Sequence, residues 1–220
     1  MDDFERILAG AGVRVSRRTL DAAYEASGSE LGRIWSAYRD VPVEGHVSAI
    51  LAAAGRDVPP QVDPPTMAAL VEAYVHPALL VPPAVDPGAR GALEALSDHG
   101  YTLAVVSNTM RTPGTTLRKV LDRYGLLGLF KHATFSDEVG IRKPAPEIFA
   151  IALRAVGGEA RTALHVGDDL LLDVEGARAA GMRVIQVRTT AEQPPVGQPA
   201  DAIIQTLADL PAAVARLDVG

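Results

Sequence analysis

The chain has 220 residues, of which 48% are hydrophobic, and a formal net charge of -6, which suits one α/β domain with an added subdomain. The acidic balance gives no basic surface for nucleic acid, and no apolar run approaches the roughly 20 residues that span a bilayer. Cysteine is absent, which excludes disulfides and thiolate metal sites, and the N-terminal sequence lacks the basic flank and apolar run of a signal peptide. We therefore expect a cytoplasmic protein with neither a nucleic-acid nor a membrane partner.

The first part of the chain, residues 1–81, carries apolar residues at helical spacing, such as Leu31, Ile34 and Trp35. This spacing predicts helices throughout. Breaks are expected at residues 10–13, 39–42, 55–65 and 76–87. In the last of these, prolines such as Pro77 are incompatible with a regular helix interior. We predict a helical subdomain over residues 1–81.

Residues 82–220 alternate between short β-rich runs and helical patterns, which is typical of a parallel sheet with helices on both faces. The predicted helices are 88–98, 115–124, 146–156, 170–180 and 207–217. The predicted strands are 101–107, 133–135, 162–166, 183–187 and 202–205. Residues 193–199, rich in proline and glycine, are expected to form a surface loop. The predicted fold class is α/β.

Polar side chains cluster after the predicted strands, where open α/β sheets bind their ligands. A serine and an asparagine end the strand 101–107, a lysine precedes the helix 146–156, and three aspartates follow the strand 162–166. The candidates are Ser107, Asn108, Lys143, Asp168, Asp169 and Asp173. Because hard cations prefer oxygen ligands, the aspartates indicate a divalent metal site.

The order of these polar groups resembles the haloacid dehalogenase superfamily, in particular its capped phosphatase branch, and the helices before Val81 resemble the cap of that branch. The resemblance implies a Rossmann-like core that hydrolyses small phosphorylated substrates. It implies that Ser107 and Asn108 bind the phosphate. Lys143 would bind it too and, as a catalytic residue, stabilise the charge that develops during transfer.

The same resemblance implies a metal site. Asp168 would bind the metal directly, with Asp169 or Asp173 as further ligands, and Asp169 is also expected to act in catalysis. Mg²⁺ is the expected metal, with Mn²⁺ and Zn²⁺ as alternatives, and Zn²⁺ would be favoured if His165 or a histidine of the helical part such as His46 contributes. Three aspartates favour phosphate esters over haloacids as substrates.

One motif of the superfamily is absent. Its members carry an Asp-x-Asp-x-Thr/Val sequence after the first, central strand, and the leading aspartate attacks phosphorus. No such sequence occurs in the 220 residues, so we expect the chain to begin just after that motif and to lack this strand. Either the strands ending at Ser107 and Val166 pair directly, or a segment of a second protomer fills the gap in a homodimer, because unpaired strand edges are costly.

Two functions follow. The first is a metal-dependent phosphatase that works without the aspartate nucleophile, through a metal-activated water. The alternative is a truncated, inactive relative that binds phosphorylated ligands or a protein partner.

Ordinary structural roles are also open for the candidates. Asp169 suits a helix N-cap and Asp173 the first turn of a helix. Ser107 could simply end a strand, Lys143 could be a solvated loop lysine, and His165, inside a buried strand, is expected to be a core histidine.

Overall fold

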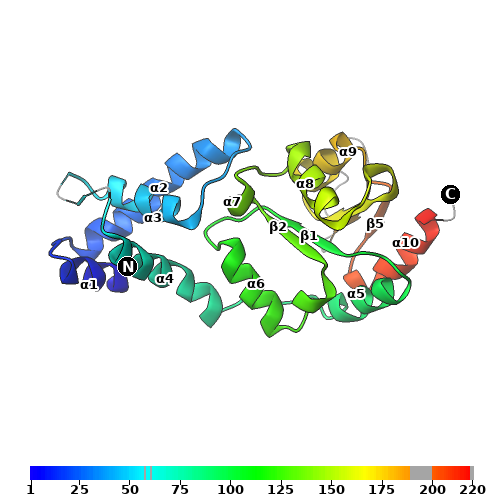
Figure 1. The fold of residues 1–220 in the computed structure, drawn as a ribbon, viewed down its shortest axis with the longest axis horizontal. Coiled ribbons are helices and arrows are strands. Elements are labelled where there is room, and N and C mark those ends of the chain that lie inside the picture. Colours follow the sequence, from blue (N-terminus) through cyan, green and yellow to red (C-terminus); the bar gives the residue numbers. More distant parts are fainter. Residues whose placement is uncertain (57, 60, 189–199, 219–220) are drawn as a thin grey trace. The chain divides into compact units, whose positions relative to one another are not determined.

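The computed structural model describes residues 1–56, 58–59, 61–188 and 200–218 (Figure 1). Contacts between residues divide the chain into two compact units. The first, called the helical unit, comprises Met1–Pro83, Thr109–Val120 and Ser136–Gly140. The second, called the α/β unit, comprises Ala84–Asn108, Leu121–Phe135 and Ile141–Gly220. This division differs from the predicted 1–81 and 82–220, because two short segments from the second half group with the helices.

The helical unit begins with helices close to those predicted. They are α1 (Asp2–Gly10), α2 (Arg17–Ser36), α3 (Val43–Ala53) and α4 (Pro64–Leu80). The Ser16 hydroxyl caps α2 by accepting a hydrogen bond from a backbone N–H at 3.2 Å, and the Asp63 carboxylate caps α4 at 2.8 Å, which satisfies backbone donors at each helix start. The apolar stripes meet in a buried core that includes Phe4, Leu8, Leu20, Val47, Ile50, Leu51 and Leu70.

Helix α4 extends further than predicted. The expected break at residues 76–87 begins too early, because α4 continues through Pro77 to Leu80. A proline costs a helix one backbone hydrogen bond but does not prevent the following residues from donating back to it. The Val81 N–H indeed donates to the Pro77 carbonyl at 3.0 Å, so the helix ends one turn after the proline.

The Asp40 carboxylate lies at the centre of a buried hydrogen-bond cluster in the helical unit. Its Oδ1 accepts hydrogen bonds from Trp35 Nε1 and from the Val41 N–H, both at 2.9 Å. Its Oδ2 accepts from the hydroxyls of Ser136 at 2.5 Å and Thr109 at 3.3 Å. Thr109 and Ser136 start the two later segments of this unit, so one side chain joins three distant parts of the sequence.

Burial alone would raise the pKa of the Asp40 carboxyl, but the polar groups around it, His46 and Ser136 foremost, hold that pKa well below its usual range. The imidazole of His46 lies with Nε2 3.9 Å from Asp40 Oδ1 and Nδ1 3.2 Å from the Tyr74 hydroxyl. Burial raises the pKa of Tyr74 to about 12. His46, considered above as a supplementary metal ligand, is therefore buried among groups of the helical unit.

Two further helices contribute to the later segments of the helical unit, α6 (Gly114–Arg123) and α7 (Ser136–Val139). The predicted helix 115–124 corresponds to α6. Helix α7 was not predicted, because a single turn is too short to show helical periodicity.

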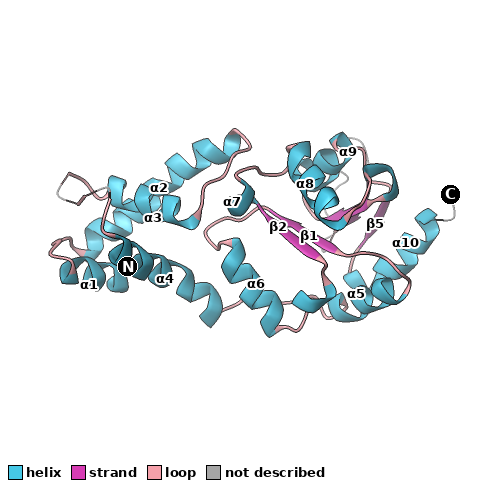
Figure 2. Cartoon of the chain, in the orientation of Figure 1, coloured by secondary structure: helices cyan, strands magenta, loops and turns pink. Residues whose placement is uncertain are grey.

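The α/β unit contains parallel strands separated by helices, which confirms the predicted fold class (Figure 2). Its strands are β1 (Ala104–Ser107), β2 (His132–Phe135), β3 (Leu164–Gly167), β4 (Arg183–Val187) and β5 (Ala202–Ile204). Its α-helices are α5 (Ala89–Asp98), α8 (Pro146–Val156), α9 (Gly176–Ala179) and α10 (Leu210–Asp218). Shorter turns of helix are η1 (Leu127–Leu129), η2 (Ala160–Thr162), η3 (Leu170–Glu175) and η4 (Leu207–Asp209).

Within the described residues these strands form two sheets, β1–β2 and β3–β4–β5. The predicted direct pairing of the strands ending at Ser107 and Val166 is therefore wrong. Each strand pairs instead with the next strand along the chain, Val106 opposite Thr134 and Val166 opposite Ile185, because a helical crossover brings consecutive strands side by side. A strand supplied by a second protomer, and hence a homodimer, stays a prediction.

The core of the larger sheet is closed by α5 and α10. Its buried members are Ala92, Leu96, Ile185, Ile204, Leu210, Ala213 and Val214. Asp86 holds the start of α5 against η4, because its carboxylate accepts hydrogen bonds from the backbone N–H groups of Gly88 at 2.7 Å and Leu207 at 3.2 Å.

No helix in the described ranges is long and apolar enough to cross a membrane. The predicted surface loop at 193–199 lies outside the described residues.

Two glycines of the α5 region should respond oppositely to alanine substitution. A Cβ on Gly88 would lie 2.8 Å from the Ala208 Cα, whereas a Cβ on Gly91 would meet nothing within 4 Å. We expect Gly88→Ala to lower the free energy of unfolding by about 1–3 kcal/mol through overpacking. Gly91→Ala should raise it by up to about 1 kcal/mol, because alanine favours the helix. Urea unfolding followed by circular dichroism measures both, and equal effects would contradict the close approach at Gly88.

Candidate active site

The Asp173 carboxylate is the centre of a charged cluster beyond the carboxyl end of β3. Its Oδ1 accepts hydrogen bonds from the Lys143 ammonium at 2.6 Å and from His165 Nε2 at 2.8 Å. Its Oδ2 accepts one from the Asp169 N–H at 3.1 Å. The side chain of Asp173 is 4% exposed and that of Lys143 is 12% exposed, so the ion pair is largely removed from water.

The backbone on both sides of the acidic turn is shaped for this carboxylate. A Cβ on Gly167 would lie 2.5 Å from Asp173 Oδ2 and nearer still to its Cγ, so only glycine leaves room at the end of β3. The next turn, η3, is a π-helix in which the N–H groups of Asp173 and Val174 both donate to the Asp169 carbonyl, at 3.0 and 3.1 Å. This wider turn replaces the start of the regular helix predicted at 170–180, and such turns are frequent at functional sites.

Three donors keep Asp173 ionised. Burial alone would raise the pKa of this carboxyl, but the hydrogen bond from His165 and the positive charge of Lys143 outweigh that effect and hold the pKa well below its usual range. A buried charge is tolerated because it is paired and hydrogen-bonded.

His165 contacts this carboxylate through Nε2. Its ring packs edge-on against Phe149, with ring centroids 5.0 Å apart and an interplanar angle of 86°, and its Nε2 is engaged by Asp173. The interpretation of His165 as a satisfied core histidine is thus the one that its surroundings favour.

The other two aspartates of the turn have different surroundings. Asp169 caps η3, because its Oδ1 accepts a hydrogen bond from the Leu172 N–H at 2.7 Å. Asp168 is exposed, and its backbone carbonyl accepts a hydrogen bond from Gln186 Nε2 at 3.1 Å. Gln186 is only 5% exposed and belongs to β4, so the position of the Asp168 backbone is fixed while its carboxylate faces solvent.

The predicted metal set of Asp168, Asp169 and Asp173 stays a prediction, and the three carboxylates differ in how free they are to bind a cation. Across the described residues, no group of three His, Cys, Asp or Glu side chains could hold a metal ion. The physical reason is that Asp173 is engaged by cations and Asp169 by a helix start, which leaves the Asp168 carboxylate. Mg²⁺ is often bound by one or two carboxylates, water and substrate phosphate, and this donor set fits that mode. It does not fit Zn²⁺, which takes three or four protein ligands.

The predicted phosphate ligands Ser107, Asn108 and Lys143 also differ in their surroundings. The Ser107 hydroxyl ends β1, and its hydrogen bond to the Asn108 carbonyl is long, at 3.5 Å. The Asn108 side chain is hydrogen-bonded to the backbone of Lys143, and the prediction that Asn108 binds substrate stays a prediction. Lys143, considered above as a possible solvated lysine, is instead an organising residue of the cluster.

Gln186 was missed by the sequence analysis. The signal for it is a single polar residue inside the apolar strand β4, RVIQV. Such a residue is buried only when it has hydrogen-bond partners, and its partner is the backbone of the acidic turn.

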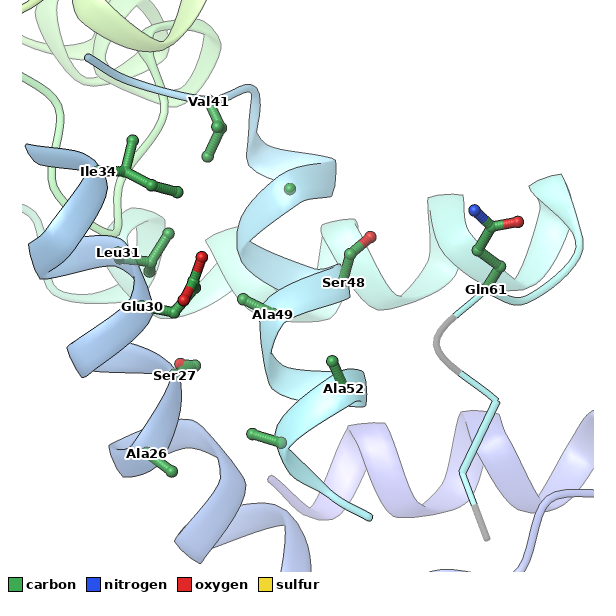
Figure 3. A pocket seen from close by; sticks show the side chains of 12 residues that line it. Ala26, Ser27, Glu30, Leu31, Ile34, Val41, Ser48, Ala49, Ala52 and Gln61 are labelled. Carbon is green, nitrogen blue, oxygen red and sulfur yellow. The ribbon is translucent and has the colours of Figure 1, made fainter. Parts of the chain in front are cut away.

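A separate groove lies between α2 and α3 of the helical unit. Figure 3 shows the side chains that line it, among them Glu30, Leu31 and Ile34 of α2 and Ser48, Ala49 and Ala52 of α3. Its volume is about 570 Å³. None of the predicted site residues lines it, so it plays no part in the cluster around Asp173.

Comparisons with known proteins give a consistent result. A family model described as haloacid dehalogenase-like hydrolase matches residues 4–181. A glyceraldehyde 3-phosphate phosphatase from Pyrococcus abyssi is 38% identical over 99 residues, which cover 45% of this chain and 40% of that protein. The chain thus spans less than half the length of this curated relative.

Two solved structures resemble the chain over nearly its whole length. The 2-haloacid dehalogenase from Pseudomonas syringae has a TM-score of 0.70 at 24% identity and covers 98% of this chain and 89% of its own. A HAD phosphatase from Thermococcus onnurineus has a TM-score of 0.57 at 26% identity, with coverages of 96% and 91%. Both have the fold described above.

The buried ion pair makes a prediction for stability. In Asp173→Asn, a neutral amide no longer balances the Lys143 ammonium, so the free energy of unfolding at pH 7 should fall by about 3 kcal/mol. Asp168→Asn, at an exposed carboxylate, is the matched control and should change it by less than about 0.5 kcal/mol. Urea unfolding of the two variants and the wild type measures the difference.

The same pair predicts a dependence on pH. The folded-state pKa of Asp173 lies below its ordinary value of 3.8, so its charge stabilises the fold above that pH, and the stabilisation is lost as the pH falls through 3.8 toward the folded pKa. The stability difference between wild type and Asp173→Asn should therefore shrink below about pH 4. A difference that stays constant down to the lowest pH at which both fold would show that the charge is not the stabilising feature.

Proposed function

Because the chain belongs to the haloacid dehalogenase-like hydrolase family, we propose that it hydrolyses phosphate esters of small molecules. The observation that supports this most is the cluster beyond β3, where the cation of Lys143 lies 2.6 Å from Asp173 and the next turn presents the exposed carboxylate of Asp168. A fixed cation beside an open carboxylate is what a phosphate monoester with a metal ion requires.

Lys143 and Ser107 would bind the phosphoryl group. The Lys143 ammonium can donate to a phosphoryl oxygen while Asp173 holds it in place, and its charge would stabilise the negative charge that grows during transfer. The Ser107 hydroxyl, at the end of β1, has only a long hydrogen bond to exchange for a phosphate oxygen.

Asp168 would hold a divalent cation, with Mg²⁺ favoured over Mn²⁺ and with Zn²⁺ disfavoured by the donor set. When bound, such a cation neutralises phosphate charge and lowers the pKa of a bound water. Asp168 can serve as its ligand because its backbone is fixed by Gln186 and its side chain stays exposed.

We further propose that water is the attacking group. The 220 residues contain no Asp-x-Asp sequence, and the carboxylates of Asp169 and Asp173 are engaged by a helix start and by Lys143. Neither is therefore poised as a nucleophile. A water beside the phosphate would instead form the new P–O bond as the bond to the alcohol oxygen breaks, and a proton of that water would pass to the departing alcohol oxygen.

The substrate class is small phosphorylated metabolites. The relative from Pyrococcus abyssi is named for glyceraldehyde 3-phosphate, which makes phosphorylated small sugars the first substrates to test.

The central test is hydrolysis by metal-stripped protein of glyceraldehyde 3-phosphate and of p-nitrophenyl phosphate, with Mg²⁺, Mn²⁺ or Zn²⁺ added back. We expect turnover with Mg²⁺. In Asp168→Asn, kcat/KM should fall by at least about 100-fold, since even residues behind a metal ligand contribute up to that much. Because Asp168 is exposed, this variant should keep the fold.

Asp169→Asn is the matched control, because asparagine caps a helix as well as aspartate does. Its kcat/KM should stay within about threefold of wild type. An equal fall in kcat/KM in Asp168→Asn and Asp169→Asn would indicate that Asp169 also acts in catalysis. A folded wild-type protein that binds phosphate but hydrolyses neither ester with any metal would overturn the proposal in favour of a non-catalytic phosphate-binding protein.

A further inference from the structure

The Asn108 side chain forms two hydrogen bonds with the backbone of Lys143, a residue 35 positions later. Its Nδ2 donates to the Lys143 carbonyl at 2.9 Å, and the Lys143 N–H donates to its Oδ1 at 2.7 Å. A primary amide presents a donor beside an acceptor, which matches the N–H and C=O of one residue. The two bonds also fix which amide atom is oxygen, since the reverse orientation would bring two donors together.

The loop that carries Lys143 is confined on its other side as well. Pro144 has no N–H with which to hold the loop in place. It lies instead against Gly176 of α9, where an added Cβ would come within 2.9 Å of the Pro144 Cα. The backbone at Lys143 is thus held between the Asn108 amide and the Gly176 backbone.

This confinement matters for the ammonium group. A lysine side chain is flexible, but its reach is limited by its four-carbon stem. The position of its backbone therefore decides which partners the ammonium can reach. With its backbone fixed, Lys143 places Nζ 2.6 Å from Asp173 Oδ1. A misplacement of about 1 Å can cost an enzyme roughly 100-fold in rate.

We propose that Asn108 is a positioning residue that acts on the reaction through Lys143 and not by binding the substrate. The inference rests on the proposed function, because it assigns Asn108 a role only where Lys143 has one. The hydrogen bonds themselves can be tested without any substrate.

The first experiment measures hydrogen exchange of the Lys143 amide by NMR. In Asn108→Ala this amide loses its acceptor and should exchange at least about tenfold faster, while amides of β4 such as that of Val184 keep their protection. Asn108→Asp keeps the Oδ1 acceptor and should keep the protection. Gln205→Ala, which removes an exposed amide, is the matched control and should change neither. Unchanged exchange of Lys143 in Asn108→Ala would overturn the inference, whatever the protein hydrolyses.

The second experiment is a double-mutant cycle on phosphate ester hydrolysis with Asn108→Ala and Lys143→Met. We expect Asn108→Ala to lower kcat/KM by roughly 10- to 100-fold in the wild-type background. In the Lys143→Met background it should have no further effect, because the group it positions is gone. An equal loss in both backgrounds would mean that Asn108 acts on the substrate directly and would contradict the inference. Absence of hydrolysis by the wild type would instead contradict the proposed function and leave the exchange measurement to decide on Asn108.

Discussion

The buried ion pair between Lys143 and Asp173 is the interaction on which the geometry of the candidate site depends. Removing both charges from water is costly, and further hydrogen bonds to the Asp173 carboxylate help to offset that cost. His165 and the Asp169 N–H supply those donors. The position of the Asp173 carboxylate also requires a glycine at residue 167, since a side chain there would occupy the space of the carboxylate.

Much of the fold follows from local patterns in the sequence. The bounds of α8 and β4 coincide with the predicted 146–156 and 183–187, because apolar spacing and glycine or proline boundaries determine both. The grouping of residues 109–120 and 136–140 with the helical unit could not be predicted, since it depends on hydrogen bonds to Asp40 from far along the chain. The two separate sheets likewise depend on which strands pair, and the direct pairing expected between the strands ending at Ser107 and Val166 does not occur.

The candidate site was predictable in its residue types but not in its geometry. The sequence presents three aspartates at one turn, yet the π-helical turn decides that Asp173 points inward, that Asp169 caps the helix and that Asp168 faces water. Asn108 lies where a phosphate ligand is expected, but whether its amide faces a ligand or a peptide group depends on a loop 35 residues away. The residue types limit which reactions the site can support, and the backbone conformation determines which contacts each side chain makes.

Asp40 and Asp173 show two ways to bury a carboxylate. Asp173 is balanced by a lysine, which a substrate anion can share. Asp40 accepts hydrogen bonds from hydroxyl, indole and backbone donors and lies near the His46 imidazole. The first arrangement suits a binding site, and the second holds distant segments of the fold together.

The Asp40 cluster has a consequence for the order in which the protein acquires its structure during synthesis. The helices that surround Asp40 are made before residues 109–136, whereas two of the hydroxyls that satisfy its carboxylate, those of Thr109 and Ser136, belong to these later segments. Until both have emerged, the Asp40 carboxylate lacks these two donors, and burial of a charge without its donors is unfavourable. The helices around Asp40 therefore cannot satisfy this carboxylate fully with their own residues, so their core is completed only when the middle of the chain is present.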